Sequence, residues 1–544
     1  MAAGRPQLNP PPKHRLLWDC SHIAEVPALN TGIERVVREM WAALAQAGPR
    51  YGLEVVPCVT DGTSRLQRLG TVPSTTDEPW QGTGPSLEPE PGDTWLLADN
   101  AWDTARLLGL SPHWRQGMRV VLLQHDLVPL QDPSATTPLT AELFSRWMRE
   151  AVAFADAFVC VSAATAEALS GTLPRLAPWR QWQSVPMPVV HPAPTWRSPG
   201  PAALPSPGQP LRLVSVGTVE PRKGYDVLLD ALEAHWHKGG RSELHIVGRP
   251  GWNSGDLHKR IRHASEGQPL LRWLDDADDA QLQAEYAWAS AFVSLSRSEG
   301  FGLPVVEAAA AGLPLLLSDI PVYRETAGES ALFVPARGQA AVREVVALLD
   351  ELTRGSVQFP ASRPAVATRT WADAADELLV ALTALPGPDM ALRRRWDQRA
   401  SLAVASLYRA EEPARAGSDL APAPGPRARP WTRPLARAYS QARLRAPAAL
   451  VRAVQGRNQL FRLVNRLDGR ASAIEARLAD LVRVGPTARA LQDLRRTEAR
   501  ETLRLELESI LAEVEQLVAE LDDGPSVAAY EGYVAKLREQ LGHH

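Results

Sequence analysis

The sequence predicts an α/β protein with two domains, each built on a parallel sheet, followed by a mostly helical C-terminal extension. Short apolar runs alternate with amphipathic helical stretches over residues 14–190, and the alternation restarts over residues 211–385. Between them, residues 191–210 are rich in proline and poor in apolar side chains, which is typical of a linker. Residues 1–13 form a Pro-rich lead-in.

Composition describes an ordinary globular protein. The 544 residues suffice for about three or four domain-sized units. A formal net charge of -3, with 45% hydrophobic and 22% charged residues, argues against a nucleic-acid binder. Cys20, Cys58 and Cys160 lack metal spacing, so we expect buried thiols in a reducing compartment. No signal-peptide core and no apolar run of about 18 residues is evident, and we therefore expect a cytoplasmic protein.

The first domain opens with a strand, a glycine-containing loop and a helix. We expect the helix over Ile33–Leu44, with Gly32 in the loop before it and Thr31 with Glu34 forming a capping box, which is also the purely structural explanation of the motif. The polar stretch 61–92 is expected to be a surface excursion. Strands are predicted at Leu16–Asp19, Leu53–Val59, Thr94–Ala98, Arg119–Leu123 and Ala157–Val161.

His125 follows the strand Arg119–Leu123 directly, so it emerges at the carboxyl end of a strand. The loop that holds Gly32 opens at the same edge of the sheet, which is where α/β folds bind ligands. The placement favours a site residue. The alternative is a loop histidine that is hydrogen-bonded to neighbouring backbone.

The second domain begins with a strand at Leu211–Val216 and continues with strands at Leu244–Val247 and Leu271–Leu274. Gly217 opens the loop Gly-Thr-Val-Glu-Pro-Arg-Lys-Gly, after which a helix is expected over Tyr225–His235. Within the loop, Arg222 and Lys223 precede the helix, where basic side chains can reinforce binding of a diphosphate. The alternative is a turn with two solvated cations.

The stretch from Glu299 to Glu307 reads Glu-Gly-Phe-Gly-Leu-Pro-Val-Val-Glu and lies between strands at Ala291–Leu295 and Leu315–Leu317. Pro304 suits the first helical turn, so the amides of Phe301, Gly302 and Leu303 are expected at the positive end of the helix dipole, ready for an anion. Both glutamates can accept hydrogen bonds from sugar hydroxyls. The alternative is that Glu299 caps the helix and Glu307 is an acid favoured by its dipole.

Four aspartates, at 275, 276, 278 and 279, invite a metal-site interpretation. They precede the helix expected over Ala280–Trp288, where acidic residues are favoured at the N-terminus. We therefore expect capping rather than a metal site.

Together these motifs resemble a known family. Gly-Thr-Val-Glu-Pro-Arg-Lys-Gly after a strand, the E-x7-E pattern of Glu299 and Glu307, Thr-Gly-Ile-Glu-Arg near the N-terminus and His-Asp-Leu-Val-Pro in the first domain are similar to those of a retaining GT-B glycosyltransferase of family 4. The resemblance covers residues 14–385, including a helix after Trp371 that looks like the one crossing back toward the first domain. It implies two Rossmann-like domains that face a cleft.

The resemblance also implies roles for individual residues. Glu299 would contact the donor sugar and Glu307 the ribose of the nucleotide. Arg222 and Lys223 would hold the diphosphate, and Gly32 would let backbone approach the phosphates.

Two further positions bear on the same site. The resemblance implies that His125 lies beside the sugar and the acceptor, and Gly217 belongs to the donor-binding loop. One departure is Thr218, because some relatives carry an additional arginine there, so neutralisation of the diphosphate would depend more on Arg222 and Lys223.

The implied reaction transfers a hexosyl unit, with mannose favoured, from a nucleotide-diphosphate sugar to a polysaccharide or lipid-linked glycan acceptor. Cations and amides would stabilise the diphosphate leaving group, so we expect no cofactor and no metal. Retention would follow if the acceptor attacks on the face that the phosphate leaves. Two alternatives are a nucleotide-sugar epimerase and a non-catalytic assembly protein that acts through its helical tail.

Beyond residue 385 the composition changes. Residues 386–434 form a linker, and the extension 435–544 carries two different helical patterns. Over 435–470 a basic amphipathic pattern favours peripheral contact with the inner face of the membrane. The alternative is a basic helix that docks on the rest of the chain or is solvated. Over 503–521 an acidic heptad pattern indicates a short coiled coil for self-association, for a partner enzyme or for folding back on the basic helix.

Overall fold

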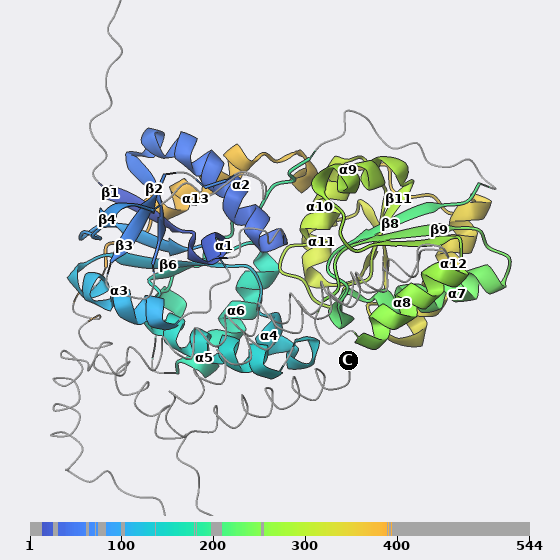
Figure 1. The fold of residues 1–544 in the computed structure, drawn as a ribbon, viewed down its shortest axis with the longest axis horizontal. Helices are drawn as coiled ribbons and strands as arrows, with labels where there is room; N and C mark the ends of the chain where they lie inside the picture. Colours follow the sequence, from blue (N-terminus) through green and yellow to red (C-terminus); the bar gives the residue numbers. More distant parts are fainter. Residues whose placement is uncertain are drawn as a thin grey trace, which may run out of the picture. The chain divides into compact units, whose positions relative to one another are not determined.

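The computed structural model describes residues 14–25, 31–60, 65–70, 72–73, 83–99, 104–136, 138–178, 180, 182–196, 209–251, 255–388, 390 and 393. These residues form two α/β domains, each with its own largely or wholly parallel sheet (Figure 1). The expected GT-B fold class, with two Rossmann-like domains, is confirmed. The lead-in 1–13, nearly all of the linker 386–434, and both helical patterns at 435–470 and 503–521 lie outside the described residues.

The first sheet has the strand order β4-β3-β2-β1-β5-β6-β7. Its strands from β2 to β7 in that order pair in parallel, whereas β3 and β4 add an antiparallel edge. The prediction of a surface excursion over 61–92 is wrong for two segments of it, because β3 and β4 form strands of the sheet there. The strands are His14–Asp19 (β1), Leu53–Val59 (β2), Leu66–Leu69 (β3), Thr83–Leu87 (β4), Thr94–Leu97 (β5), Arg119–Gln124 (β6) and Ala157–Cys160 (β7).

The helices of the first domain include α2, which begins at Gly32 and whose first turn is tied by a hydrogen bond from the Thr31 amide to Glu34 at 3.0 Å. The expected capping box is confirmed. The α-helices are Ser21–Glu25 (α1), Gly32–Ala47 (α2), Thr104–Gln116 (α3), Val128–Gln131 (α4), Pro138–Phe154 (α5) and Ala163–Leu176 (α6), and the short 3-10 turns are Gly48–Tyr51, Pro133–Ala135 and Trp182–Ser184.

The second sheet has the order β10-β9-β8-β11-β12-β13, with every neighbouring pair parallel. β8 lies between β9 and β11, so the loops after these three strands leave from the same carboxyl edge. The strands are Arg212–Val216 (β8), Glu243–Val247 (β9), Leu271–Leu274 (β10), Ala291–Ser294 (β11), Leu315–Ser318 (β12) and Ala331–Val334 (β13), the last of which the sequence did not predict.

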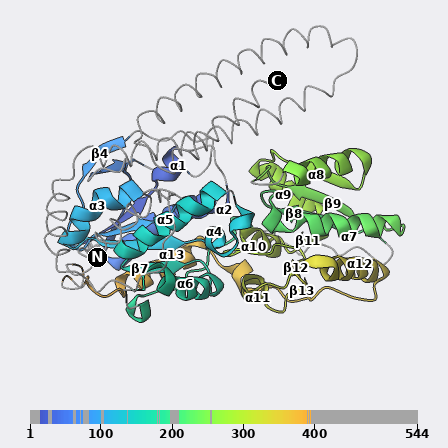
Figure 2. The ribbon, with the colours of Figure 1, turned by 90° about the horizontal axis from the view of Figure 1, so that it is seen from below.

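Helices cover both faces of the second sheet. On one face α7 and α12 lie side by side over the strands (Figures 1 and 2). On the other face α9, α10 and α11 form a second apolar core with the sheet. The helices are Tyr225–His237 (α7), Gly255–Gly267 (α8), Asp279–Trp288 (α9), Leu303–Ala310 (α10), Pro321–Ala327 (α11) and Gly338–Arg354 (α12), with 3-10 turns at Pro221–Lys223 and Ala365–Thr368.

The last described helix, α13 (Trp371–Thr383), follows the second domain in sequence but packs on the first. Its buried face contributes Leu378 and Leu379 to the same core as Val36 and Met40 of α2. In Figure 1 the orange α13 accordingly lies beside the blue α2. The chain therefore joins the two domains a second time, after the first crossing between β7 and β8.

The cysteines, the aspartates before α9 and the hydropathy of the helices were also subjects of sequence predictions. Cys20, Cys58 and Cys160 are buried free thiols, as expected. Asp278 caps α9 by accepting a hydrogen bond from the Gln281 amide at 2.7 Å, so capping is confirmed at this position. Among the helices that the structure describes, none combines the length and apolar character needed to cross a membrane.

Candidate functional site

A cluster of charged side chains lies where the loops after β8 and β11 meet. Lys223 donates from Nζ to Glu299 Oε1 at 2.6 Å, and Arg222 donates to Glu299 Oε2 at 3.1 Å. Arg222 also pairs with Glu220 at 2.7 Å. The structure therefore brings together Arg222, Lys223 and Glu299, although Lys223 and Glu299 are 76 positions apart in the sequence.

The backbone explains why these two loops approach so closely. β8 and β11 are neighbouring parallel strands, so both loops open at one edge. Gly224 has a φ of 70°, and a Cβ there would lie 2.0 Å from the carbonyl oxygen of Leu295. The amide of Arg297 donates to the carbonyl of Arg222 at 2.7 Å. Glycine at position 224 is thus required both by its φ and by the closeness of the β11 loop.

Electrostatics keep Glu299 ionised. Burial of its carboxyl group opposes ionisation, but Lys223 and Arg222 outweigh this effect and hold the pKa of Glu299 at about 2. Ser296 donates to the same carboxylate at 2.7 Å. The alternative in which Glu299 caps the following helix is wrong, because Gly302 is the N-cap of α10 and no side chain caps it.

Gly217 lies against the cation at position 223. Its φ is 146°, and a Cβ placed on it would lie 3.5 Å from Lys223 Nζ. The Gly217 carbonyl accepts a hydrogen bond from the Tyr225 hydroxyl at 2.8 Å. The start of the loop is therefore anchored to α7, beside the charged cluster.

The N-terminus of α10 is set by glycine. Gly302 has a φ of 82°, and a Cβ there would meet Tyr323 at 2.7 Å. The side chains of Phe301 and Leu303 are buried, with Phe301 stacked on His191 at a ring-centroid distance of 5.8 Å. For Phe301 and Leu303 only the backbone amides are therefore candidates for binding an anion, as the sequence had indicated.

Glu307 lies inside α10 and is 4% exposed. Its Oε2 accepts a hydrogen bond from the Tyr286 hydroxyl at 3.2 Å, and its Oε1 accepts one from Arg35 at 3.2 Å. Burial raises the pKa of Glu307 to about 6, although Arg35 and Tyr286 favour the charged form. A carboxylate accepts about four hydrogen bonds, so two contacts leave capacity for ligand hydroxyls.

Arg35 is a site residue that the sequence analysis missed. It belongs to α2 of the first domain, yet it pairs with Asp279 at 2.8 Å as well as with Glu307. Its guanidinium lies over the Trp196 ring, 4.1 Å from the ring centroid. The signal was present in the motif Thr-Gly-Ile-Glu-Arg, but we assigned a role only to its glycine. Tyr286 and Tyr323 had no comparable sequence signal.

The ring of His125 is hydrogen-bonded to backbone, which is the contact that the alternative interpretation of this residue expected. Its Nε2 faces the carbonyl oxygen of Ala98 at 2.7 Å and must therefore carry the proton. Burial lowers the pKa of His125, which favours a neutral ring. A Cβ on Gly300 would lie 1.8 Å from the His125 carbonyl oxygen, so the Glu299 loop lies directly against the carboxyl end of β6.

Gly32 is the first residue of α2 and is exposed. No atom lies within 4 Å of a Cβ built on it, so the N-terminus of α2 faces open space. Among the described residues, no hydrogen bond or ion pair links Gly32 or Glu307 directly to the cluster of Arg222, Lys223 and Glu299. The predicted residues thus form two groups, one at the β8 and β11 loops and one where α2 meets α10.

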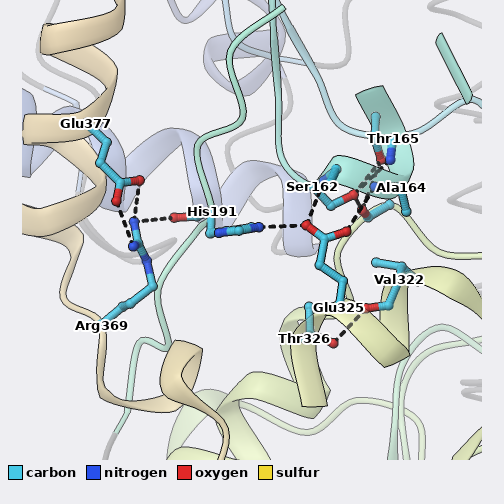
Figure 3. A network of polar contacts seen from close by, with 11 residues as sticks. Ser162, Ala164, Thr165, His191, Val322, Glu325, Thr326, Arg369 and Glu377 are labelled. Carbon is cyan, nitrogen blue, oxygen red and sulfur yellow. Dashed lines mark hydrogen bonds and ion pairs between the residues drawn. The ribbon is translucent and has the colours of Figure 1, made fainter. Parts of the chain in front are cut away.

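A second set of polar contacts joins the domains beside the site (Figure 3). Glu325 of α11 accepts hydrogen bonds from the amides of Ala163 and Ala164, at 2.6 and 2.9 Å, and thereby caps α6 of the first domain. It also pairs with His191 at 2.7 Å. Partial burial would raise the pKa of Glu325, but these hydrogen bonds lower it.

The backbone of the Glu299 loop is bound at the same interface. Ser162 and Thr165, at the start of α6, donate to the carbonyl oxygen of Gly300 at 2.5 and 3.0 Å. Over the described part of the chain, no three His, Cys, Asp or Glu side chains converge as a metal site would require. The arrangement offers fixed cations, helix amides and paired carboxylates, which suit an anionic ligand with hydroxyl groups.

Comparison with known proteins finds similarity to glycosyltransferases in part of the chain. Residues 200–353 match the family model described as glycosyl transferases group 1. Serotype-specific mannosyltransferase WbdA of Escherichia coli is 31% identical over 367 residues, which is 62% of this chain and 42% of that protein. The chain is therefore similar to glycosyl transferases group 1 over residues 200–353. Its matched part contains both the Arg222 loop and the Glu299 loop.

Two further proteins are similar to this chain, one over a short segment and one at low identity. The GDP-mannose:cellobiosyl-diphosphopolyprenol alpha-mannosyltransferase of Xanthomonas oryzae is 40% identical over 110 residues, covering 20% of this chain and 28% of that protein. The solved sucrose-phosphate synthase of Thermosynechococcus elongatus aligns at 18% identity and a TM-score of 0.43, over 73% of this chain and 99% of that one. The chain spans less than half the length of these curated relatives.

Proposed function

We propose that the protein is a retaining hexosyltransferase, with mannose as the favoured sugar, that uses a nucleotide-diphosphate sugar and needs no metal. The acceptor would be a polysaccharide or a lipid-linked glycan. The observation that carries the proposal is the convergence of Arg222 and Lys223 on Glu299, in the segment that matches the family model. The mannosyltransferases among the relatives favour mannose, and the relative named for GDP-mannose favours that donor.

In the proposed reaction the bond between the sugar C1 and the diphosphate oxygen breaks while a bond from C1 to an acceptor oxygen forms on the same face. The acceptor hydroxyl proton passes to the departing phosphate oxygen, which balances the step. Lys223, Arg222 and the amides at the start of α10 stabilise the charge that develops on the diphosphate. Because these groups are already fixed by Glu299 and Glu220, little reorganisation is needed at the moment of reaction.

The remaining site residues orient the donor in this proposal. Glu307 accepts hydrogen bonds from the ribose hydroxyls, and Glu299 accepts them from the sugar. His125 is neutral and is hydrogen-bonded to the Ala98 carbonyl. In this proposal it lies beside the sugar as a fixed polar group rather than as a cation. The site draws on both domains, so the surrounding protein would limit access of water and hydrolysis of the donor.

A panel of nucleotide-diphosphate sugars, assayed for release of the nucleoside diphosphate with and without acceptor glycans, tests the proposal. We expect GDP-mannose to be turned over, with no loss in the presence of a chelator, and Glu307→Ala to abolish turnover. Glu329→Ala removes an exposed acid from the same domain and is the matched control. An intact protein that binds donors but turns none of them over would contradict the proposal and favour an assembly role.

A further inference from the structure

The positive charges of the cluster at the β8 and β11 loops are already neutralised by carboxylates of the protein. Arg222 is paired with Glu220 and Glu299, and Lys223 is paired with Glu299. Two cations therefore face two carboxylates. A diphosphate that carries negative charge on both phosphates would meet a neutral cluster, and its stabilisation would be incomplete without a further cation.

Arg249 is a cation at the same edge, and no described residue forms an ion pair with it. It follows β9, the strand next to β8, and its side chain is exposed. Over the described part of the chain, its guanidinium donates no hydrogen bond and no carboxylate lies within ion-pair distance. Nearby arginines of this domain differ, since Arg222 and Arg297 are both paired.

The backbone fixes the position of Arg249 beside the donor loop. The amide of Val219 donates to the Arg249 carbonyl at 2.9 Å, and the amide of Gly251 donates back to Val219 at 2.9 Å. A Cβ on Gly248 would lie 2.1 Å from the Gly217 carbonyl oxygen, so the two loops touch. Arg249 is thus attached to the segment that carries Glu220 and Arg222.

Carboxylates of both domains act on the charge of Arg249. Although the side chain is open to solvent, partial enclosure by protein lowers the pKa of Arg249, and the carboxylates that favour its charge are Glu34 of α2 and Glu220. Glu34 lies two residues from Gly32, at the N-terminus of α2. Because this cation is exposed and has no ion-pair partner among the described residues, it is available to an anionic ligand.

We propose that Arg249 is a third diphosphate-binding cation, which supplies the net positive charge that the balanced Arg222 and Lys223 cluster lacks. The inference rests on the proposed function, because it assigns a further contact to the same donor. Arg249 could also supply the positive charge that some relatives have from an arginine at the position of Thr218. The loop after Arg249 lies close to Thr218, since a Cβ on Gly251 would lie 2.5 Å from Thr218 Cγ2.

Calorimetric titration of the full chain with GDP and UDP, and with guanosine and uridine by competition, tests this assignment. Loss of a charged hydrogen bond weakens binding by about tenfold or more. We therefore expect Arg249→Ala to lower the affinity for the nucleoside diphosphates by that factor. Binding of the nucleoside should change little, and Arg249→Lys should restore part of the loss. The slope of affinity against salt concentration should also fall.

Arg241→Ala is the matched control, because Arg241 is an exposed arginine just before the opposite end of β9. We expect it to bind both diphosphates as the wild type does. Equal affinity of wild type and Arg249→Ala for the diphosphate would overturn the inference, as would an equal loss for the nucleoside. If the wild type bound neither diphosphate, the proposed function itself would fail, which is a different result.

Discussion

Arg35 of the first domain donates a hydrogen bond to Glu307 of the second, over a distance of 3.2 Å. This contact supports the buried carboxylate that we assign to the ribose. We expect Arg35→Met to raise the donor KM about tenfold, with a smaller change in kcat, because a buried carboxylate that loses its cation becomes harder to ionise. Arg35→Lys should retain part of the affinity.

The pH profile separates this role from a merely structural one. In Arg35→Met the acid limb of kcat/KM should move to higher pH, because loss of the cation raises the pKa of Glu307 further. Arg50→Met removes an arginine of the same domain that pairs with Asp376 at the surface, and it should leave the profile unchanged. If kcat/KM fell in Arg35→Met but its acid limb stayed at the same pH, Arg35 would act on the fold alone.

Lys223 is the cation with the shortest contact to Glu299, at 2.6 Å. Lys223→Ala should lower the rate of donor turnover by at least about a hundredfold, because one preorganised group that stabilises the leaving diphosphate is lost. Lys259→Ala removes an exposed lysine from α8 of the same domain and should have no effect. A near-normal rate in Lys223→Ala would contradict the assignment of Lys223 as a group that stabilises the diphosphate.

Glu307 should couple stability and donor binding to pH in opposite directions. Its pKa in the folded protein, about 6, is raised above the ordinary value of 4.5 by burial. A raised pKa means that its contribution to stability is fully present below about pH 4.5 and is lost as the pH rises through about 6. Over the same range the carboxylate becomes ionised, so donor affinity should rise.

Urea unfolding of the wild type and Glu307→Gln between pH 4.5 and 7 measures the first effect. The difference in unfolding free energy between the two proteins should change by about 2 kcal/mol across this window, since one pKa unit corresponds to about 1.4 kcal/mol. The amide does not titrate, which makes Glu307→Gln the reference. A constant difference across the window would show that Glu307 does not titrate there.

Gly300 has no room for a side chain. Because a Cβ would lie 1.8 Å from the carbonyl oxygen of His125, Gly300→Ala must push the Glu299 loop away from the first domain. A displacement of about 1 Å can lower a rate by about a hundredfold, so we expect turnover to fall by at least tenfold. Gly267→Ala, at a position with no atom within 4 Å, is the control. Full activity in Gly300→Ala would show that this contact is not maintained in solution.

Glu325 caps α6 across the domain boundary, and its removal should loosen the interface. We expect Glu325→Ala to lower the free energy of unfolding by about 1 kcal/mol, as for loss of an N-cap, and to increase the radius of gyration measured by X-ray scattering. The exposed residue Glu329 gives the control variant Glu329→Ala. Unchanged scattering together with unchanged stability would mean that the Glu325 contacts do not hold the domains together.

Local sequence patterns predicted most of the fold. Apolar runs and the spacing of helix-forming residues marked ten of the strands, because buried parallel strands and amphipathic helices leave periodic signals. β3, β4 and β13 were missed. β3 and β4 read Leu-Gln-Arg-Leu and Thr-Gly-Pro-Ser-Leu and carry few apolar residues, whereas β13 reads Ala-Leu-Phe-Val and was overlooked although it is apolar throughout. The loops with Arg222, Lys223 and Glu299 were recognised because glycine and proline mark their turns.

The sequence by itself determined the two alternating α/β segments, the loops at their strand ends and the residue types that could bind a charged sugar nucleotide. Only the tertiary structure decided which side chains meet. Arg35 and Glu307 are 272 positions apart, and Arg249 lies beside the Arg222 loop because β9 pairs with β8. Periodicity reports on neighbours within one element, whereas contacts between elements depend on how the domains pack, which no local pattern encodes.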